Sequence, residues 1–176
     1  MRLLLTVCIL VLLAAADCCH ARTIEGTVKA VYDGDTILLV TRDASQVKTR
    51  LYGIDAPETA KPDKPGQPFG EAAKRTLRSK IMGRRVSAEI IEVDQYQRIV
   101  AVVRCDGRDI NREMVAEGMA WAYRHYLQGP YASEYIGAEA RARSRRDGLW
   151  HDLNPQPPWE FRQALKGGRQ PGRGHW

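Results

Sequence analysis

Three acidic side chains stand where predicted β-strands begin or end. Asp35 opens one apolar run, and Asp55 and Glu58 come directly after the next one. If the two strands are neighbours in a sheet, Asp35 and Asp55 can converge. Ala56 precedes Pro57, and a residue before proline favours an extended backbone, which can turn the Ala56 carbonyl toward the same point. The sequence therefore predicts a cluster of oxygen atoms at this place.

The predicted cluster consists of two carboxylates and a carbonyl, with room for water, and no His or Cys is nearby in the sequence. Hard cations prefer oxygen ligands, so this set suits Ca²⁺ better than Zn²⁺. The alternative is that these acids only form turns, because Asp is common in turns. Asp33, which precedes Gly34, fits that second description, and we predict it to be a turn residue.

Two arginines accompany the acidic residues. Arg50 lies in the predicted strand that ends just before Asp55, and Arg98 lies in the turn DQYQR at residues 94–98. A guanidinium presents two donors in one plane, which matches two phosphate oxygens. A divalent cation, two arginines and a carboxylate would together make a phosphodiesterase site. Taken alone, Arg98 is a weak signal, because a lone arginine is usually a surface charge.

Five predicted strands must position these side chains. Each is an alternating or apolar run bounded by turn residues. The Asp33-Gly34 pair between the first two runs is a strong hairpin signal. A loop with four prolines follows the third run and excludes regular structure there. The five predicted strands are residues 23–31, 35–41, 47–54, 85–93 and 99–104.

Three predicted helices complete the domain. Apolar residues at helical spacing mark residues 69–82. A short helix is predicted at residues 111–118 with Asn111 as its N-cap, and a last one at residues 130–146 with Pro130 in its first turn. Five strands with a helix after the third are compatible with an α+β, mainly β fold. We predict a five-stranded OB-fold Greek-key barrel with about three helices.

Residues 1–21 are predicted to be a secretory signal peptide. A basic start is followed by an almost unbroken apolar run and then by small residues. Cleavage after Ala16 and cleavage after Ala21 both fit, and Ala21 is favoured because a strand pattern starts directly after it. The apolar run is short for a membrane span, which needs about 20 residues. We predict an exported protein, periplasmic or secreted, with anchoring by an uncleaved segment as the alternative.

Cleavage after Ala21 would leave Cys105 as the single cysteine, so the exported protein would rely on its hydrophobic core and not on a disulfide. The rest of the 176-residue chain is long enough for one compact domain, predicted at residues 22–160. A basic tail at residues 161–176 is expected to be disordered. The net charge of +6 favours a protein that meets a polyanion, although an ordinary basic exported protein fits it too.

Four motifs follow one another along the chain: DGDT at 33–36, RLYGIDAPE at 50–58, DQYQR at 94–98 and NREMVAEGMAWAY at 111–123. In order and spacing they resemble the staphylococcal (micrococcal) nuclease family, the thermonucleases. GLW at 148–150 and the region of Trp159 resemble the tail of exported bacterial members. The resemblance covers about residues 25–150. It implies an OB-fold barrel with helices and a Ca²⁺-dependent nuclease that acts on DNA and RNA.

The resemblance also implies a role for each matching position. Asp35 and Asp55 match the carboxylates that bind calcium, and Ala56 matches the residue that gives its backbone carbonyl. Glu58 matches the catalytic carboxylate. The other matches are two phosphate-binding arginines, Arg50 and Arg98, and nucleotide-contacting tyrosines, Tyr96 together with Tyr123 or Tyr126.

The chain departs from the family pattern at several positions. Ala56 stands in place of a threonine, which changes little because only the backbone oxygen is needed. Gln95 replaces a lysine and removes one phosphate contact. Gln97 replaces a glycine in the turn before Arg98, a change that could alter the loop and shift Arg98.

We therefore predict a calcium-dependent endonuclease, a phosphodiester hydrolase that binds and cleaves DNA and RNA with little sequence preference. No small-molecule cofactor is expected, and the resemblance suggests a monomer. The alternative is a non-catalytic nucleic-acid-binding OB module of the cell envelope. Such a module would keep the basic charge and the aromatic residues but lose part of the carboxylate and arginine set, all of which is present here.

Overall fold

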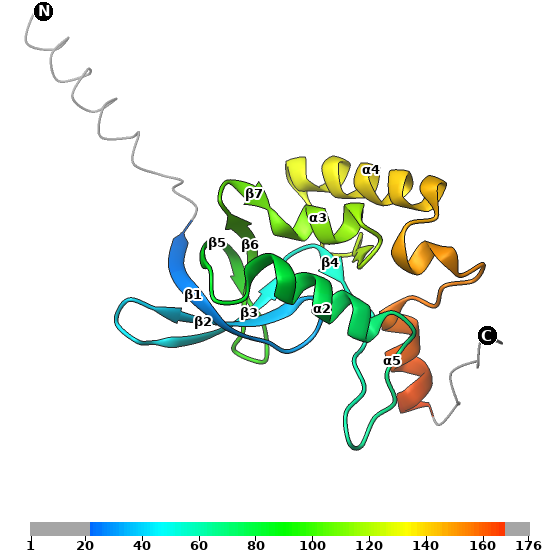
Figure 1. Cartoon of the computed structure of the whole chain (residues 1–176), viewed down its shortest axis with the longest axis horizontal. Coiled ribbons are helices and arrows are strands. Elements are labelled where there is room, and N and C mark those ends of the chain that lie inside the picture. The colour runs from blue at the N-terminus through cyan, green and yellow to red at the C-terminus, as the bar shows by residue number, and fades with distance from the viewer. Residues whose placement is uncertain (1–21, 168–176) are drawn as a thin grey trace, which may run out of the picture.

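The computed structural model describes residues 22–167, in which a small β-barrel carries helices on its surface (Figure 1). The predicted signal peptide at residues 1–21 lies outside the described residues, as does the end of the predicted tail, residues 168–176. Within the described part of the chain, no helix is both long enough and apolar enough to cross a membrane.

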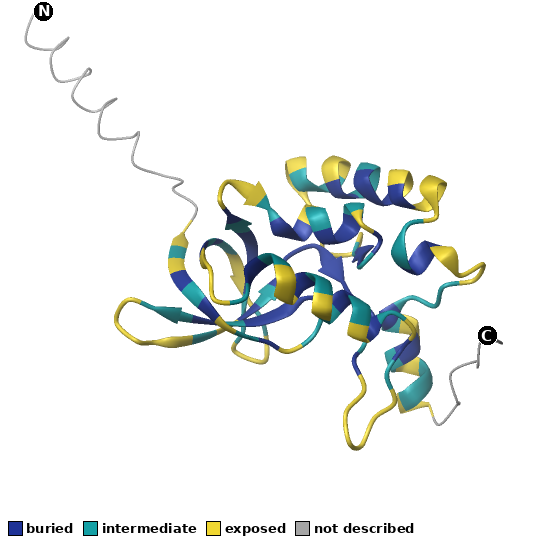
Figure 2. Ribbon diagram, viewed as in Figure 1, coloured by how far each residue is buried: buried dark blue, intermediate teal, exposed yellow. Residues whose placement is uncertain are grey.

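Five strands close into the barrel. They are β1 (Thr23–Val31), β2 (Thr36–Thr41), β3 (Gln46–Leu51), β5 (Arg85–Val93) and β6 (Ile99–Cys105). Neighbours pair in the order β3-β2-β1-β5-β6, and a parallel pairing of β3 with β6 closes the ring. Inward-facing side chains such as Val28, Ile37 and Val102 have no exposed surface, and Figure 2 shows the buried residues along the barrel and the helices. The predicted five-stranded OB-fold barrel is confirmed.

The strand predicted over residues 47–54 is broken at Gly53. Ile54–Asp55 forms a separate strand, β4, which pairs with β8 (Trp121–Ala122) and not with the barrel strands. Gly53 has a φ of 70°, a conformation that favours glycine. A Cβ at this position would lie 2.4 Å from a leucine side chain. The prediction of one continuous strand is wrong, and the break brings Asp55 out of the barrel wall.

Helices complete the described part of the chain. Within residues 22–167 they are α2 (Gly70–Ile81), α3 (Ile110–Ala116), α4 (Gly129–Arg145), the 3-10 helix η1 (Gly148–His151) and α5 (Pro158–Lys166). The first three α-helices correspond to predicted ones, but α5 was not predicted. Its start is proline-rich, yet Pro158 occupies the first helical turn, where no backbone donor is needed. The predicted disordered tail from residue 161 is therefore wrong for residues 161–166, which belong to α5.

Asn111 is not the helix cap that the sequence predicts. Asp109, at the end of the short strand β7 (Arg108–Asp109), caps α3 by accepting a hydrogen bond of 2.9 Å from the Arg112 amide. Asn111 has no exposed surface, and its side chain instead makes three buried hydrogen bonds. The partners, each at 3.0 Å, are the Val103 amide and the carbonyls of Tyr52 and Ala101. Asn111 thus fastens α3 to β6 and to the chain just before the strand break.

Replacing Asn111 with alanine should lower the free energy of unfolding by about 3 kcal/mol, because buried backbone groups would lose their partners. Urea denaturation followed by circular dichroism measures this change. The matched control is Asn154→Ala at an exposed position, which should stay within about 0.5 kcal/mol of the wild type. Similar losses in both variants would contradict the role of Asn111.

Candidate functional site

A hairpin turn positions Asp35 at the start of β2. Asp33 Oδ1 accepts a hydrogen bond of 3.1 Å from the Asp35 amide, so Asp33 forms the turn. Gly34 has no space for a side chain, because a Cβ there would lie 2.6 Å from the Cβ of Ala56 and 2.7 Å from that of Ala73. The turn therefore packs directly on the loop after β4 and on α2, and Asp35 is 3% exposed.

One guanidinium joins Asp35 to Asp55. Arg50 Nη1 donates to Asp35 Oδ1 at 2.8 Å, and Arg50 Nη2 donates to Asp55 Oδ1 at 2.9 Å. Nη2 also contacts the Ile54 carbonyl at 3.3 Å. The Arg50 side chain is 19% exposed, and the Asp55 side chain is fully buried. The structure thus places the two carboxylates that were predicted to converge on opposite ends of one arginine fork.

Crowding of negative charge affects the pKa values of these acids. Burial disfavours the charged form of Asp35, but Arg50 and the Ala56 amide outweigh it and lower the pKa of Asp35. Burial raises the pKa of Asp55, although hydrogen bonds from arginines oppose this. Burial and the charge of Asp35 raise the pKa of Asp33 to about 7. Carboxylates so close together gain from an added cation.

The loop after β4 carries Ala56 and Glu58. The Ala56 amide donates to Asp35 Oδ2 at 3.0 Å, which ties this loop to the start of β2. The Glu58 amide donates to Gln67 Oε1 at 3.1 Å. Gln67 Nε2 in turn donates to the Gln156 carbonyl at 3.1 Å. Gln67 therefore fixes the backbone of Glu58 and ties it to the segment before α5.

A third arginine, which was not predicted, enters the site from α5. Arg162 donates to the two oxygens of Asp55 at 3.1 and 2.8 Å, and its Nη1 also donates to Glu58 Oε1 at 2.8 Å. The partners lie 107 and 104 positions away in the sequence, so no spacing rule connects them. The signal that could have located α5 is the pattern PWEFR, with Pro158 in the first turn and Phe161 buried.

An open cavity of about 390 Å³ collects the predicted functional residues. The turn between β5 and β6 contributes Tyr96 and Arg98, and the segment after β8 contributes Tyr123 and Tyr126. Asp55 and Ala56 are buried and do not line the cavity. The other site residues that line it are Asp35, Arg50, Glu58 and Arg162.

Gln97 does not remove Arg98 from this cavity. Gln97 has a φ of 59°, the left-handed conformation that glycine adopts readily. Arg98 Nε donates to Asp94 Oδ2 at 2.7 Å, and Nη2 forms an ion pair with the same oxygen at 2.7 Å. Its guanidinium lies 5.4 Å from the centre of the Tyr96 ring. Arg98 thus stands in the cavity wall, paired with an acid of its own turn.

The predicted nucleotide-contacting tyrosines differ in accessibility. Tyr96 is 70% exposed and Tyr126 is 49% exposed. Tyr123 stacks on Trp159 with ring centres 5.1 Å apart and ring planes within 1°, and Tyr126 meets it edge-on at 4.9 Å. One face of the Tyr123 ring is therefore covered. Tyr96 and Tyr126 offer the more accessible rings.

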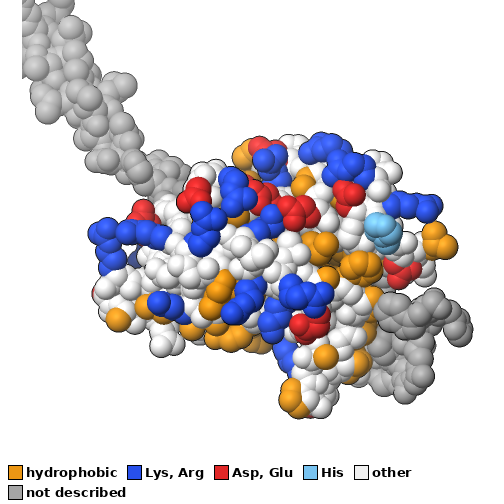
Figure 3. Space-filling view, in the orientation of Figure 1, with side chains coloured by type: hydrophobic (Ala, Val, Ile, Leu, Met, Phe, Trp, Pro, Cys, Tyr) orange, Lys and Arg blue, Asp and Glu red, His pale blue; other side chains and the backbone are white. Residues whose placement is uncertain are grey.

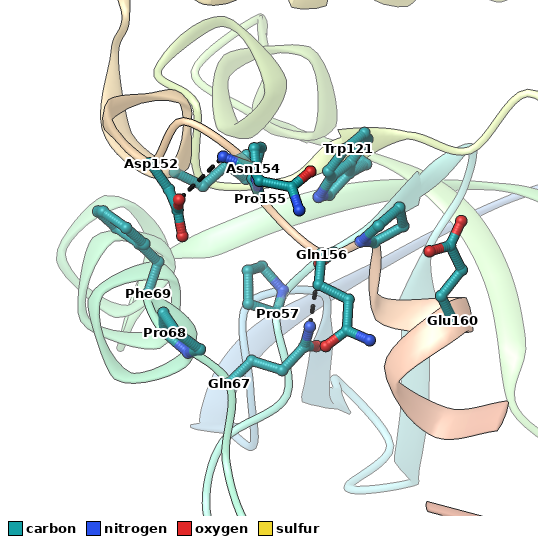
Figure 4. A pocket seen from close by; sticks show the side chains of 12 residues that line it. Pro57, Gln67, Pro68, Phe69, Trp121, Asp152, Asn154, Pro155, Gln156 and Glu160 are labelled. Carbon is teal, nitrogen blue, oxygen red and sulfur yellow. Dashed lines mark hydrogen bonds between the residues drawn. The ribbon is translucent and has the colours of Figure 1, made fainter. Parts of the chain in front are cut away.

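A second cavity, of about 440 Å³, lies between the loop before α2 and the segment before α5 (Figure 4). Its walls are mostly proline, aromatic and amide side chains, with the hydrogen-bonded pair of Gln67 and Gln156 on one side. None of the described residues that line it is Lys or Arg. The groups that could act on a phosphate therefore belong to the first cavity.

The acids at and directly behind the first cavity fit a hard cation in their chemistry. Asp35, Asp55 and Glu58 offer carboxylate oxygens, and the Ala56 carbonyl adds another oxygen nearby in the chain. Within residues 22–167, no three or more acidic, His or Cys side chains are gathered around one point as a ready metal site. The guanidinium of Arg162 lies between Asp55 and Glu58 instead.

The family model and the similar proteins that match this chain point to the same family, the staphylococcal nucleases. Residues 48–152 match the family model described as staphylococcal nuclease homologue. A micrococcal nuclease of Shigella flexneri is 40% identical over 152 residues, which cover 81% of this chain and 82% of that protein. An uncharacterized endonuclease of Haemophilus influenzae is 36% identical over 165 residues, 94% of this chain and 87% of the relative.

A plant relative, the probable staphylococcal-like nuclease CAN1 of Oryza sativa subsp. japonica, is 36% identical over 125 residues. The match covers 71% of this chain but 35% of that longer protein. The range matched by the family model contains Arg50, Asp55 and Glu58, whereas Asp35 and Arg162 lie outside it.

Proposed function

Because the chain belongs to the staphylococcal nuclease family, we propose that it is a calcium-dependent endonuclease that hydrolyses DNA and RNA with little sequence preference. The observation that carries the proposal is the pairing of Asp35 and Asp55 on Arg50, together with Glu58, which lines the same open cavity as Asp35 and Arg50. Buried carboxylates, arginines and an accessible glutamate are the groups that phosphodiester hydrolysis needs.

Asp35, Asp55 and the carbonyl of Ala56 would hold Ca²⁺, as the oxygen-only donor set favours. When bound, the ion supplies Lewis-acid polarisation of the phosphate. The chain's own contribution is to keep both buried carboxylates charged and close together. Arg50 does so through its two hydrogen bonds, which offset the cost of burying the acids.

Glu58 is the general base in this proposal. Its side chain is 26% exposed at the cavity, so water can reach it. The hydrogen bond between its amide and Gln67 holds its backbone while the carboxylate orients a water molecule and takes its proton. Arg50 and Arg98 stabilise the negative charge that grows on the phosphate, and a positioned donor of this kind contributes roughly 3 kcal/mol.

Weak sequence preference follows from the kind of contact available. Contacts to phosphate oxygens carry no sequence information. The exposed rings of Tyr96 and Tyr126 can stack on any base. Figure 3 shows many Lys and Arg side chains on one face of the molecule, and the net charge of +6 favours approach of a polyanion.

Export is also part of the proposal, because residues 1–21 have the layout of a signal peptide, with anchoring by that segment as the alternative. The competing function is a non-catalytic nucleic-acid-binding module of the cell envelope. The set of acids and arginines at this cavity, with the buried Asp55 bonded to Arg50 behind it, favours the enzyme.

Purified protein should cleave both DNA and RNA in Ca²⁺ and lose activity in excess chelator, since phosphate polarisation then disappears. A gel assay with single-stranded DNA, duplex DNA and RNA, in Ca²⁺, Mg²⁺ and chelator, measures this. Full activity in chelator would contradict the calcium assignment. Binding without cleavage under every condition would favour the non-catalytic module.

Glu58→Gln should fold normally and lose about 99% or more of the cleavage rate, because the amide cannot accept a proton from water. Initial rates on single-stranded DNA measure the loss, and thermal unfolding checks the fold. Glu134→Gln, at an exposed position of α4, is the matched control and should keep the wild-type rate. Near wild-type turnover of Glu58→Gln would remove Glu58 from its proposed role.

A further inference from the structure

Arg162 lies outside the range that matches the family model, yet its guanidinium makes three hydrogen bonds inside the site. It bridges Asp55, which is fully buried, and Glu58, which faces the cavity. A guanidinium at this place reduces the repulsion between the two carboxylates. In the ligand-free protein, Arg162 therefore contacts the oxygens that the proposed function assigns to a cation and a water molecule.

The helix that carries Arg162 is firmly attached to the domain. Phe161 is 3% exposed. Trp159 stacks on Tyr123 at 5.1 Å and meets the edge of Trp121 at 5.6 Å. In Figure 1, α5 lies beside the loop that leads into α2. With the helix held by these contacts, the long Arg162 side chain can change its partner while the backbone stays in place.

α5 presents two cations to the cavity. Arg162 and Lys166 both line it, and they are one helical turn apart, about 6 Å along the helix axis. The Arg162 side chain is 36% exposed while that of Asp55 is fully buried, so the guanidinium stands between the buried acids and the open cavity. Arg50 and Arg98 line the same cavity. A phosphodiester there would meet guanidinium groups from three segments of the chain.

Asp55 does not depend on Arg162 alone. Arg50 Nη2 also donates to Asp55 Oδ1 at 2.9 Å. If Arg162 turned toward a phosphate, Asp55 would keep this partner, and a bound cation would replace the positive charge that had left. Glu58 would lose its ion pair with Arg162 and could accept a proton from water.

We propose that Arg162 is a third phosphate-binding arginine of this site, which exchanges Asp55 and Glu58 for the substrate phosphate when a cation and a nucleic-acid strand enter the cavity. The planar fork that now holds a carboxylate matches phosphate oxygens equally well. Through Arg162, α5 contributes a substrate-binding residue to the active site. The inference rests on the proposed function, because the phosphate in question is that of the nucleic-acid substrate.

The direct test measures binding without turnover. The probe is a short, labelled single-stranded DNA in which methylene groups replace the bridging oxygens, so that it keeps its charge and resists hydrolysis. Fluorescence anisotropy in Ca²⁺ over a range of salt concentrations compares the wild type with Arg162→Ala and Arg162→Lys. Arg75→Ala, which removes the same charge from an exposed position of α2, is the matched control.

Arg162→Ala should weaken binding by about tenfold and reduce the slope of log affinity against log salt by about one, because one phosphate contact is lost. Arg162→Lys keeps the positive charge, so its salt dependence should equal that of the wild type. Its affinity for the oligonucleotide should lie between those of Arg162→Ala and the wild type, because lysine lacks the planar fork. Calorimetry should find Ca²⁺ binding to Arg162→Ala at least as tight as to the wild type, because the competing cation is gone. Cleavage should fall by about tenfold or more in kcat/KM.

The test applies when the wild type cleaves DNA and the variants unfold at the same temperature as the wild type. Three results would then overturn the inference. If Arg162→Ala and Arg75→Ala bind the oligonucleotide with the same affinity and the same salt dependence, Arg162 does not bind phosphate. Faster cleavage by Arg162→Ala would make Arg162 an inhibitory residue. Weaker Ca²⁺ binding would make it a positioning residue of the metal site. If the wild type cleaves neither DNA nor RNA, the proposed function fails, and the oligonucleotide titration still decides whether Arg162 contacts phosphate.

Discussion

A single guanidinium holds the candidate site together. Arg50 joins Asp35, at the start of β2, to Asp55 in β4. An ionised carboxylate buried without a partner costs several kcal/mol, and among the described residues Arg50 is the one group that offsets this cost for both acids at once, whereas Arg162 reaches Asp55 alone of the two. In the pairing of β2 with β3, Arg50 lies opposite Thr36. Thr36 directly follows Asp35 in the chain, so this register brings Arg50 close to Asp35. Strand register and charge pairing therefore depend on each other.

Much of this arrangement can be predicted from the sequence, because it rests on local signals. The Asp-Gly pair marks the hairpin turn, and Asp33 indeed accepts the hydrogen bond that closes it. Alternating and apolar runs mark the barrel strands, since each strand buries one face. Placing two neighbouring strands brings the start of one and the end of the other to the same edge, and the structure has Asp35 and Asp55 both on Arg50.

The remainder depends on contacts between distant parts of the chain. The break at Gly53 is set by a side chain that follows β8, which no local pattern reveals. Asn111 has the chemistry of a helix cap, but Asp109 takes that role while Asn111 is enclosed between α3 and the barrel. Arg162 reaches Asp55 across 107 positions from a segment whose prolines resemble a loop. Tertiary packing decides each of these outcomes.

Calcium binding measured without substrate tests most directly whether Asp35 and Asp55 form a cation site. Calorimetry would compare the wild type with Asp35→Asn, which removes a charge at Arg50, and with Asp33→Asn, which keeps an oxygen for the turn hydrogen bond. We predict that Asp35→Asn weakens Ca²⁺ binding by about tenfold or more, whereas Asp33→Asn stays within about threefold of the wild type. Equal weakening in both variants, or a wild type that binds no Ca²⁺, would contradict the site.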